Sequence, residues 1–136
     1  MCLALFPPDS SFYRATIVGS KDFSVEVFYC DYGNSDLVER SDLYEITRDL
    51  VKLPAQAILC KLHGVRPPDN EETWSERSIR VFDELALNRM LFALSKGVEE
   101  DGVRRVILVD TTRGDDDIHI KSEMIAQRAA LSDIEE

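Results

Sequence analysis

The run FYCDYGN, from Phe28 to Asn34, places two tyrosines three residues apart, Tyr29 and Tyr32, where an apolar strand gives way to a turn. A corner of this kind can aim both rings at one point. Two more aromatic residues, Phe6 and Tyr13, lie upstream on the strands expected to pair with this one. Because the faces of aromatic rings attract cations, these four rings predict a cage that binds a positively charged group.

A guanidinium suits such a cage. It is planar, delocalised and weakly hydrated, and each good contact with a ring contributes about 0.5–2 kcal/mol. Methylation keeps its charge and adds apolar area. The amide of Asn34 at the rim can accept a remaining N–H, which would distinguish methylated arginine from a methylated ammonium. Methyllysine in the same cage, or an unmodified peptide on a barrel edge, is the alternative ligand.

Taken singly, an aromatic residue in a strand is more often core than binding surface. Side chains alternate between the two faces of a strand, so Phe12 and Phe28 face away from Tyr13 and Tyr29 and are expected to be ordinary core. Replacing Tyr29 or Tyr32 by Ala is then expected to remove the binding preference and to leave the fold largely intact.

Residues 1–52 consist of short predicted strands separated by turn residues, with loops expected at 7–10 and 19–22. The period-two pattern of residues 25–30 is typical of a strand with two different faces. Arg14 and Asp31 are expected to form an internal ion pair that supports the corner after this strand. The spacing of these elements predicts a small β-barrel.

Residues 53–136 carry a different mixture of elements. A linker is expected at 53–55, followed by a strand at 56–62 and a helix that begins at the capping box Thr73–Glu76. Further along, strands are expected at 90–94 and 103–109, an extended piece at 118–120 and a helix over 122–131. The first helix has one continuous face, expected to be core, that carries Trp74, Ser78, Val81, Phe82 and Leu85. The chain as a whole is predicted to be mostly β with helices, an α+β fold.

The 136 residues include 16 Lys plus Arg and 26 Asp plus Glu, a net charge of −10. This surplus repels nucleic acids and anionic membranes and favours a cationic partner. The three cysteines lie far apart without a C-x-x-C pair, which argues against a disulfide framework and a zinc site. No apolar run approaches the roughly 20 residues that span a bilayer. We expect a soluble intracellular protein with no metal or cofactor, no membrane contact and no direct contact with nucleic acid.

Catalysis is not expected either. Metal-dependent cleavage of nucleic acid needs a carboxylate cluster that holds the metal beside arginines that stabilise the transition state. Asp115, Asp116 and Asp117, with Arg113, come nearest to such a set. A loop this acidic is usually solvated surface.

Several short runs resemble the extended Tudor family, namely FYRA at 12–15, VFYCDYGN at 27–34, LPAQA at 53–57, VDTT at 109–112 and DIHI at 117–120. The resemblance covers nearly the whole chain. It implies a five-strand Tudor barrel at residues 1–52, followed at 53–136 by a linking helix and part of a unit like staphylococcal nuclease, an OB-type fold. It also implies that this second unit lacks its N-terminal strands, which leaves self-association or pairing with a missing N-terminal segment open.

In that family the cage takes symmetric dimethylarginine from Arg-Gly or Arg-Ala tails of Piwi-type proteins, and the family's cage positions fall on Phe6, Tyr13, Tyr29, Tyr32 and Asn34. The resemblance therefore implies a methylarginine reader that scaffolds small-RNA (piRNA) ribonucleoprotein assemblies in cytoplasmic, perinuclear germ granules (nuage). A scaffold or dimerisation module that binds an unmodified peptide, with a vestigial cage, is the alternative function.

Overall fold

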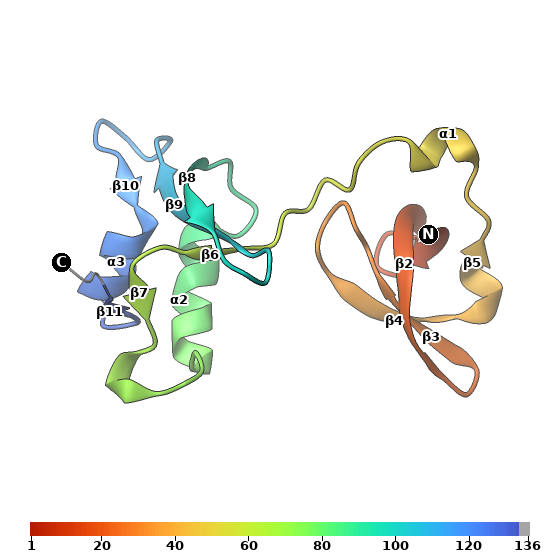
Figure 1. The fold of residues 1–136 in the computed structure, drawn as a ribbon, viewed down its shortest axis with the longest axis horizontal. Coiled ribbons are helices and arrows are strands. Elements are labelled where there is room, and N and C mark those ends of the chain that lie inside the picture. The colour runs from red at the N-terminus through yellow and green to blue at the C-terminus, as the bar shows by residue number, and fades with distance from the viewer. Residues whose placement is uncertain (134–136) are drawn as a thin grey trace. The chain divides into compact units, whose positions relative to one another are not determined.

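The computed structural model describes residues 1–133, which form two compact units divided between Leu59 and Cys60 (Figure 1). The first unit is a small β-structure, and the second combines a sheet with helices. The fold class predicted from the sequence, mostly β with helices, is confirmed. The first unit continues to Leu59, past the boundary expected at residue 52.

The first unit is a five-stranded antiparallel sheet with the strand order β4-β3-β2-β1-β5. Its elements are β1 (Cys2–Phe6), β2 (Ser11–Lys21), β3 (Ser24–Phe28), β4 (Ser35–Glu39), the 3-10 helix η1 (Arg40–Asp42), β5 (Leu43–Tyr44) and α1 (Arg48–Val51). The number of strands agrees with the five-strand barrel implied by the resemblance. Phe6 ends β1, Tyr13 lies near the beginning of β2, and Tyr29 directly follows β3.

The core of this unit is built from small and β-branched side chains around one tyrosine. Its buried members are Ala4, Ala15, Val25, Val27, Tyr29 and Val38. The period-two pattern predicted from residue 25 is therefore present, since Val25, Val27 and Tyr29 all face inward. Burying each of these valines contributes about 1.5–3 kcal/mol.

Two aromatic residues expected in the core are not there. The side chain of Phe12 is 47% exposed and its ring packs edge-on against Tyr44, with centroids 5.1 Å apart. Phe28 is only half-buried. Both lie on the sheet face opposite the core, because side chains alternate along a strand and their neighbours Tyr13, Val27 and Tyr29 pack inward.

Strand β2 is longer than the turn residues suggested. It runs through Gly19 to Lys21, with a β-bulge between Ile17 and Gly19 in its pairing with β3. A glycine inside a strand is typical of such a bulge. The reversal to β3 therefore takes place later than the expected loop at 19–22, at Asp22 and Phe23.

The second unit is organised around the strand β9 (Arg104–Asp110). This strand pairs in parallel with β6 (Cys60–Leu62) and antiparallel with β8 (Phe92–Val98) and β10 (Ile118–His119). The remaining elements are β7 (Val65–Arg66), the 3-10 helix η2 (Pro68–Asn70), α2 (Glu76–Ala86), α3 (Ile120–Ala126) and β11 (Leu131–Ser132), which pairs with β7. The buried core consists of Val81, Leu85, Ile120, Met124, Ala129 and Ala130.

Helix α2 begins later than the capping box Thr73–Glu76 predicted. Its N-cap is Ser75, whose hydroxyl accepts a hydrogen bond from the backbone N–H of Ser78 at 3.1 Å. The expected core face is otherwise present, with one exception. Trp74 precedes the N-cap Ser75, so it lies outside the helix, and it is 38% exposed.

The limits of two other elements also differ from expectation. Strand β8 does not end at residue 94 but continues to Val98, because a bulge between Ser95 and Gly97 lets the pairing with β9 go on. At Gly97 a Cβ atom would lie 2.7 Å from the guanidinium of Arg105, so the absence of a side chain permits this approach. Helix α3 begins earlier than expected and ends at Ala126, before a left-handed turn at Arg128 with φ 59°.

No helix within residues 1–133 combines the length and the apolar character that crossing a membrane requires.

The cap of α2 gives a first testable prediction. Replacing Ser75 by Ala removes the acceptor for the Ser78 N–H and is expected to lower the free energy of unfolding by about 1 kcal/mol. Urea titration followed by circular dichroism measures this change. Thr73→Ala is the matched control and should change it by less than about 0.5 kcal/mol. The opposite ranking would identify Thr73 as the cap.

Candidate functional site

A cavity of about 230 Å³ opens in the first unit. It is lined by Phe6, Asp9, Tyr13, Tyr29, Tyr32 and Asn34. All five residues named from the sequence are therefore brought together, with one addition. The volume lies below the roughly 300–1,000 Å³ of sites for drug-sized ligands, so the cavity fits the head of a single side chain better than a larger molecule.

Two chain reversals supply these side chains. Phe6 is the last residue of β1, Asp9 lies in the turn that follows, and Tyr13 lies on β2, where its register partner is Ala4 of β1. The other three, Tyr29, Tyr32 and Asn34, lie in the reversal between β3 and β4. The β1–β2 and β3–β4 reversals therefore meet at one end of the sheet.

The reversal between β3 and β4 is held by its own backbone. The N–H of Tyr29 donates to the carbonyl of Asn34 at 2.8 Å, and the N–H groups of Tyr32 and Gly33 both donate to the carbonyl of Tyr29, at 3.1 and 2.8 Å. Gly33 has φ 90°, a conformation that glycine adopts without steric cost. The left-handed residue is thus Gly33, and Asn34 is left free to present its amide.

Neighbouring rings of the cage meet edge to face. Tyr13 is central, with its centroid 6.1 Å from that of Phe6, 6.4 Å from Tyr29 and 5.3 Å from Tyr32, and with interplanar angles between 83° and 88°. The rings of Phe6 and Tyr29 lie 5.5 Å apart at 82°. Edge-to-face contacts of this kind are favourable for aromatic pairs. All four rings line the same cavity, so a cation that enters it meets aromatic surface.

Tyr29 and Tyr32 differ in their roles. Tyr29 is 1% exposed, belongs to the core, and donates its hydroxyl hydrogen to the carbonyl of Leu5 at 2.7 Å. Burial raises the pKa of its phenol. Tyr32 is 71% exposed and forms the outer lip of the cavity. The expectation that either tyrosine could be removed without harm to the fold is therefore not supported for Tyr29.

The expected ion pair between Arg14 and Asp31 is present beneath the corner. The side chain of Arg14 is only 8% exposed, and its Nε donates to Asp31 Oδ2 at 2.8 Å while Nη2 donates to Oδ1. The hydrogen bonds from Arg14 lower the pKa of the Asp31 carboxyl. Because the charge of Asp31 is held by this pair, it is not free to serve as a ligand contact.

The same pair attaches α1 and the segment after it to the barrel. Arg14 also donates to the carbonyls of Leu50, Leu53 and Pro54, and Asp31 Oδ1 accepts from the backbone N–H of Gln56 at 3.0 Å. These bonds explain why the first unit extends past residue 52.

Asp9 is the cavity residue that the sequence did not identify. Its Oδ1 accepts from the Ser11 N–H at 2.9 Å, and its Oδ2 accepts from the hydroxyl of Tyr13. The hydrogen bond to Asp9, together with burial, raises the pKa of the Tyr13 phenol. In the sequence Asp9 is one of several turn residues after Pro7 and Pro8. Its position three residues after Phe6 and four before Tyr13 was the available signal.

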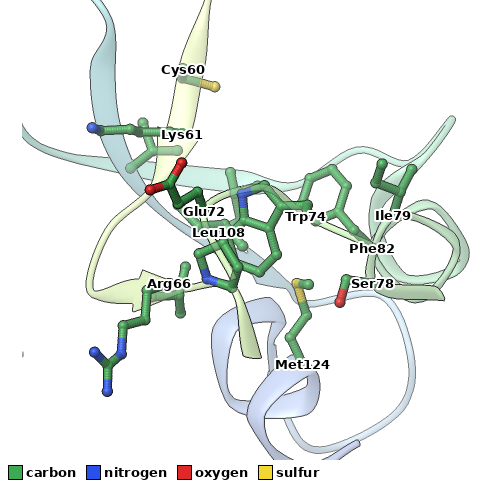
Figure 2. Close-up of a pocket in the computed structure, with 14 residues that line it drawn as sticks. Cys60, Lys61, Arg66, Glu72, Trp74, Ser78, Ile79, Phe82, Leu108 and Met124 are labelled. Carbon is green, nitrogen blue, oxygen red and sulfur yellow. The ribbon is translucent and has the colours of Figure 1, made fainter. Parts of the chain in front are cut away.

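The second unit has a larger cavity of about 430 Å³ (Figure 2). Its lining is mainly apolar and includes Trp74, Phe82, Leu108 and Met124, while the charged end of Arg66 points away from it. This cavity holds no constellation of groups that suggests chemistry.

Arg113 does not pair with the acidic loop at 115–117 beside it. Arg113 instead donates to Asp110 Oδ2 at 2.7 Å and to the carbonyl of Leu85 at 2.7 Å. Within residues 1–133, His, Cys, Asp and Glu form no group of three that could hold a metal ion.

Comparison with known proteins identifies a family model and solved structures that match this chain. The family model described as "Tudor domain" matches residues 1–64. The extended Tudor domain of Drosophila melanogaster Papi is 30% identical and has a TM-score of 0.86, with 96% of this chain and 70% of that chain covered. The chain belongs to the extended Tudor family.

Two further members of this family show the extent of the similarity. The extended Tudor domain of human TDRD1, solved in complex with a symmetrically dimethylated peptide, is 28% identical with a TM-score of 0.84, and 96% of this chain and 63% of that chain are covered. Tudor domain-containing protein 5 of Mus musculus is 38% identical over 121 residues, which are 85% of this chain and 11% of that protein. The chain thus spans about a tenth of the length of this curated relative.

The unequal burial of the two tyrosines predicts unequal effects on stability. Tyr29→Ala removes a core ring and a buried hydrogen bond and is expected to lower the free energy of unfolding by about 3–5 kcal/mol. Tyr32→Ala removes an exposed ring and should cost less than about 1 kcal/mol. Urea denaturation of both variants measures the difference. Equal losses would contradict the assignment of Tyr29 to the core.

The Arg14–Asp31 pair predicts a specific dependence on acid. Because the folded pKa of Asp31 is lowered, its contribution to stability is complete above the ordinary value of 3.8 and is lost as the pH falls through the lower folded value. Asp31→Asn is expected to cost about 2 kcal/mol at pH 7 and to flatten the fall in stability below about pH 4.

Urea titrations at pH 7 and pH 3 measure this dependence. Asp49→Asn provides the control, because the ion pair of Asp49 with Lys52 is exposed and such pairs contribute little. A loss at Asp31 no larger than the loss at Asp49 would rule out the supporting role of the buried pair.

Proposed function

We propose that this extended Tudor domain reads symmetric dimethylarginine on arginine-rich tails of partner proteins. The observation that carries the proposal is the cavity of the first unit, walled by the rings of Phe6, Tyr13, Tyr29 and Tyr32 with Asn34 beside them. A cavity of this size accepts one side-chain head group. The partner would then be selected by a single modified residue and by the backbone around it.

The chemistry of the ligand matches the chemistry of the wall. Dimethylation leaves the guanidinium charged, so attraction to the ring faces is retained, and the two methyl groups add apolar area that the rings can cover. Symmetric dimethylation leaves one N–H on each terminal nitrogen, and the exposed amide of Asn34 can accept one of them. An ammonium without N–H groups would leave this acceptor unused.

Similar domains support the choice of ligand. The human TDRD1 domain described above holds a symmetrically dimethylated peptide, and the third extended Tudor domain of mouse TDRD1 was solved with a MILI peptide that contains dimethylarginine. A variant of the Drosophila Papi domain was solved with an unmethylated Piwi N-terminal peptide, which supports the class of partner but not the methylation. On this support we infer that the partner is the Arg-Gly- or Arg-Ala-rich tail of a Piwi-type protein.

The wider role follows from this partner. A domain that reads such tails without catalysis would act as a scaffold for piRNA ribonucleoproteins, in the cytoplasmic germ granules where the family gathers. A scaffold with a vestigial cage that binds an unmodified peptide is the rival function. Methylation is what separates the two, since the rival requires equal binding of modified and unmodified tails.

Titration calorimetry with Arg-Gly peptides tests the proposal. The peptide with symmetric dimethylarginine is expected to bind in the micromolar range, more tightly than its asymmetric and unmodified forms. Tyr32→Ala removes an exposed ring that contacts the ligand and should weaken binding about 2- to 30-fold.

Phe23→Ala is the matched control, because Phe23 is an aromatic residue 88% exposed at the β2–β3 turn, away from the cavity. It should leave the affinity unchanged. Equal affinity for the modified and unmodified peptides would favour the rival scaffold. Tighter binding of the asymmetric form would refute the assignment to symmetric dimethylarginine.

A further inference from the structure

The aromatic cavity carries one negative charge, that of Asp9, among neutral groups. Asp9 lies on its wall, and the other lining residues are aromatic side chains and one amide. Within residues 1–133, Asp9 takes part in no ion pair with Lys, Arg or His. In this part of the chain, a carboxylate placed beside four ring faces therefore lacks a counter-ion.

The carboxylate is held in place from both sides. Asp9 Oδ1 accepts the Ser11 N–H, and Oδ2 accepts the Tyr13 hydroxyl. The turn that carries it is closed by the backbone N–H groups of Asp9 and Ser10, which donate to the carbonyl of Phe6 at 3.3 and 2.9 Å. A carboxylate offers about four acceptor positions, so each oxygen keeps one for a ligand.

Stabilising the turn accounts for only one of the two hydrogen bonds that Asp9 accepts. The bond from the Ser11 N–H to Oδ1 spans two residues and is the one that aspartate commonly makes in turns. The bond from the Tyr13 hydroxyl to Oδ2 is not needed for the turn. It joins the carboxylate to the ring that contacts the other three rings of the cage.

We propose that Asp9 is a specificity-determining residue that pairs directly with the guanidinium in the cage. The inference rests on the proposed function. It adds that the site recognises the positive charge of the guanidinium through the carboxylate of Asp9. In this arrangement the rings cover the methyl groups and ring-facing atoms of the ligand, while Asp9 accepts an N–H from its edge. Charge-assisted hydrogen bonds are stronger than neutral ones, so the pairing raises affinity and makes it dependent on salt.

A second role for Asp9, which would act only through Tyr13, has different consequences. If the carboxylate merely orients the Tyr13 ring, then removing the hydroxyl of Tyr13 should weaken binding as much as removing the charge of Asp9. If Asp9 touches the ligand, its removal should weaken binding even when that hydroxyl is already absent. The pair of variants Asp9→Asn and Tyr13→Phe, alone and combined, separates these roles.

Asp9→Asn is a mild substitution. It keeps the size of the side chain and the oxygen that accepts the Ser11 N–H, and it removes the charge. Asp22→Asn is the matched control, since it removes one charge from the turn at the opposite end of β2. Both variants change the net charge of −10 by the same amount.

The experiment measures the Kd of an Arg-Gly peptide with symmetric dimethylarginine at about 50 and 300 mM salt. Asp9→Asn is expected to weaken binding about tenfold at low salt and to reduce the salt dependence, in the wild-type and in the Tyr13→Phe background. Asp22→Asn should leave both quantities close to those of the wild type.

Two results would overturn the inference while leaving the proposed function intact. One is a wild-type affinity and salt dependence in Asp9→Asn. The other is a loss in Asp9→Asn that vanishes in the Tyr13→Phe background, which would make Asp9 a positioning residue only. Failure of the wild-type protein to bind the methylated peptide would instead overturn the proposed function, and this inference with it.

Discussion

The position of the cage depends on one buried guanidinium. Arg14 donates to both oxygens of Asp31, in the turn after β3 that carries the cage tyrosines. It also donates to the carbonyl of Leu50 in α1 and to those of Leu53 and Pro54 after α1. A guanidinium carries five N–H donors in a rigid plane, so it can bond a carboxylate and several backbone carbonyls at the same time. The single ammonium of a lysine could not. The turn that carries Tyr29 and Tyr32 is therefore held in place relative to residues 50–54, and the two rings are held with it.

The cage and the core of the first unit have one residue in common, Tyr29. Tyr29 is fully buried and bonded to Leu5, whereas Tyr32 and Asn34 are exposed. The wall that Tyr29 forms is thus part of the packed interior, whereas Tyr32 and Asn34 line the cavity from the surface. Since a rigid wall needs no ordering when the ligand arrives, it limits the entropic cost of binding.

The sequence predicts the local features of this site better than the long-range ones. Alternation predicted that β3 has two different faces, and opposite charges at Arg14 and Asp31 predicted the ion pair. Alternation separated Phe12 and Phe28 from Tyr13 and Tyr29, but it could not show which face of the sheet is buried, because that depends on how the strands pack together. The sequence also did not predict that Asp9 lines the cavity. An aspartate in a turn has a sufficient local explanation, and only the fold brings its second oxygen to Tyr13.

Charge acts in the proposed function at two distances. The net charge of −10 produces a field that attracts basic tails, and salt screens it over about 8 Å at physiological ionic strength. Such a field cannot recognise methylation, because arginine keeps its charge when it is methylated. Discrimination must therefore come from contact inside the cavity, where the rings respond to apolar area and a fixed carboxylate responds to N–H groups. Long-range attraction would then set how fast tails arrive, and the cage would set which of them stay.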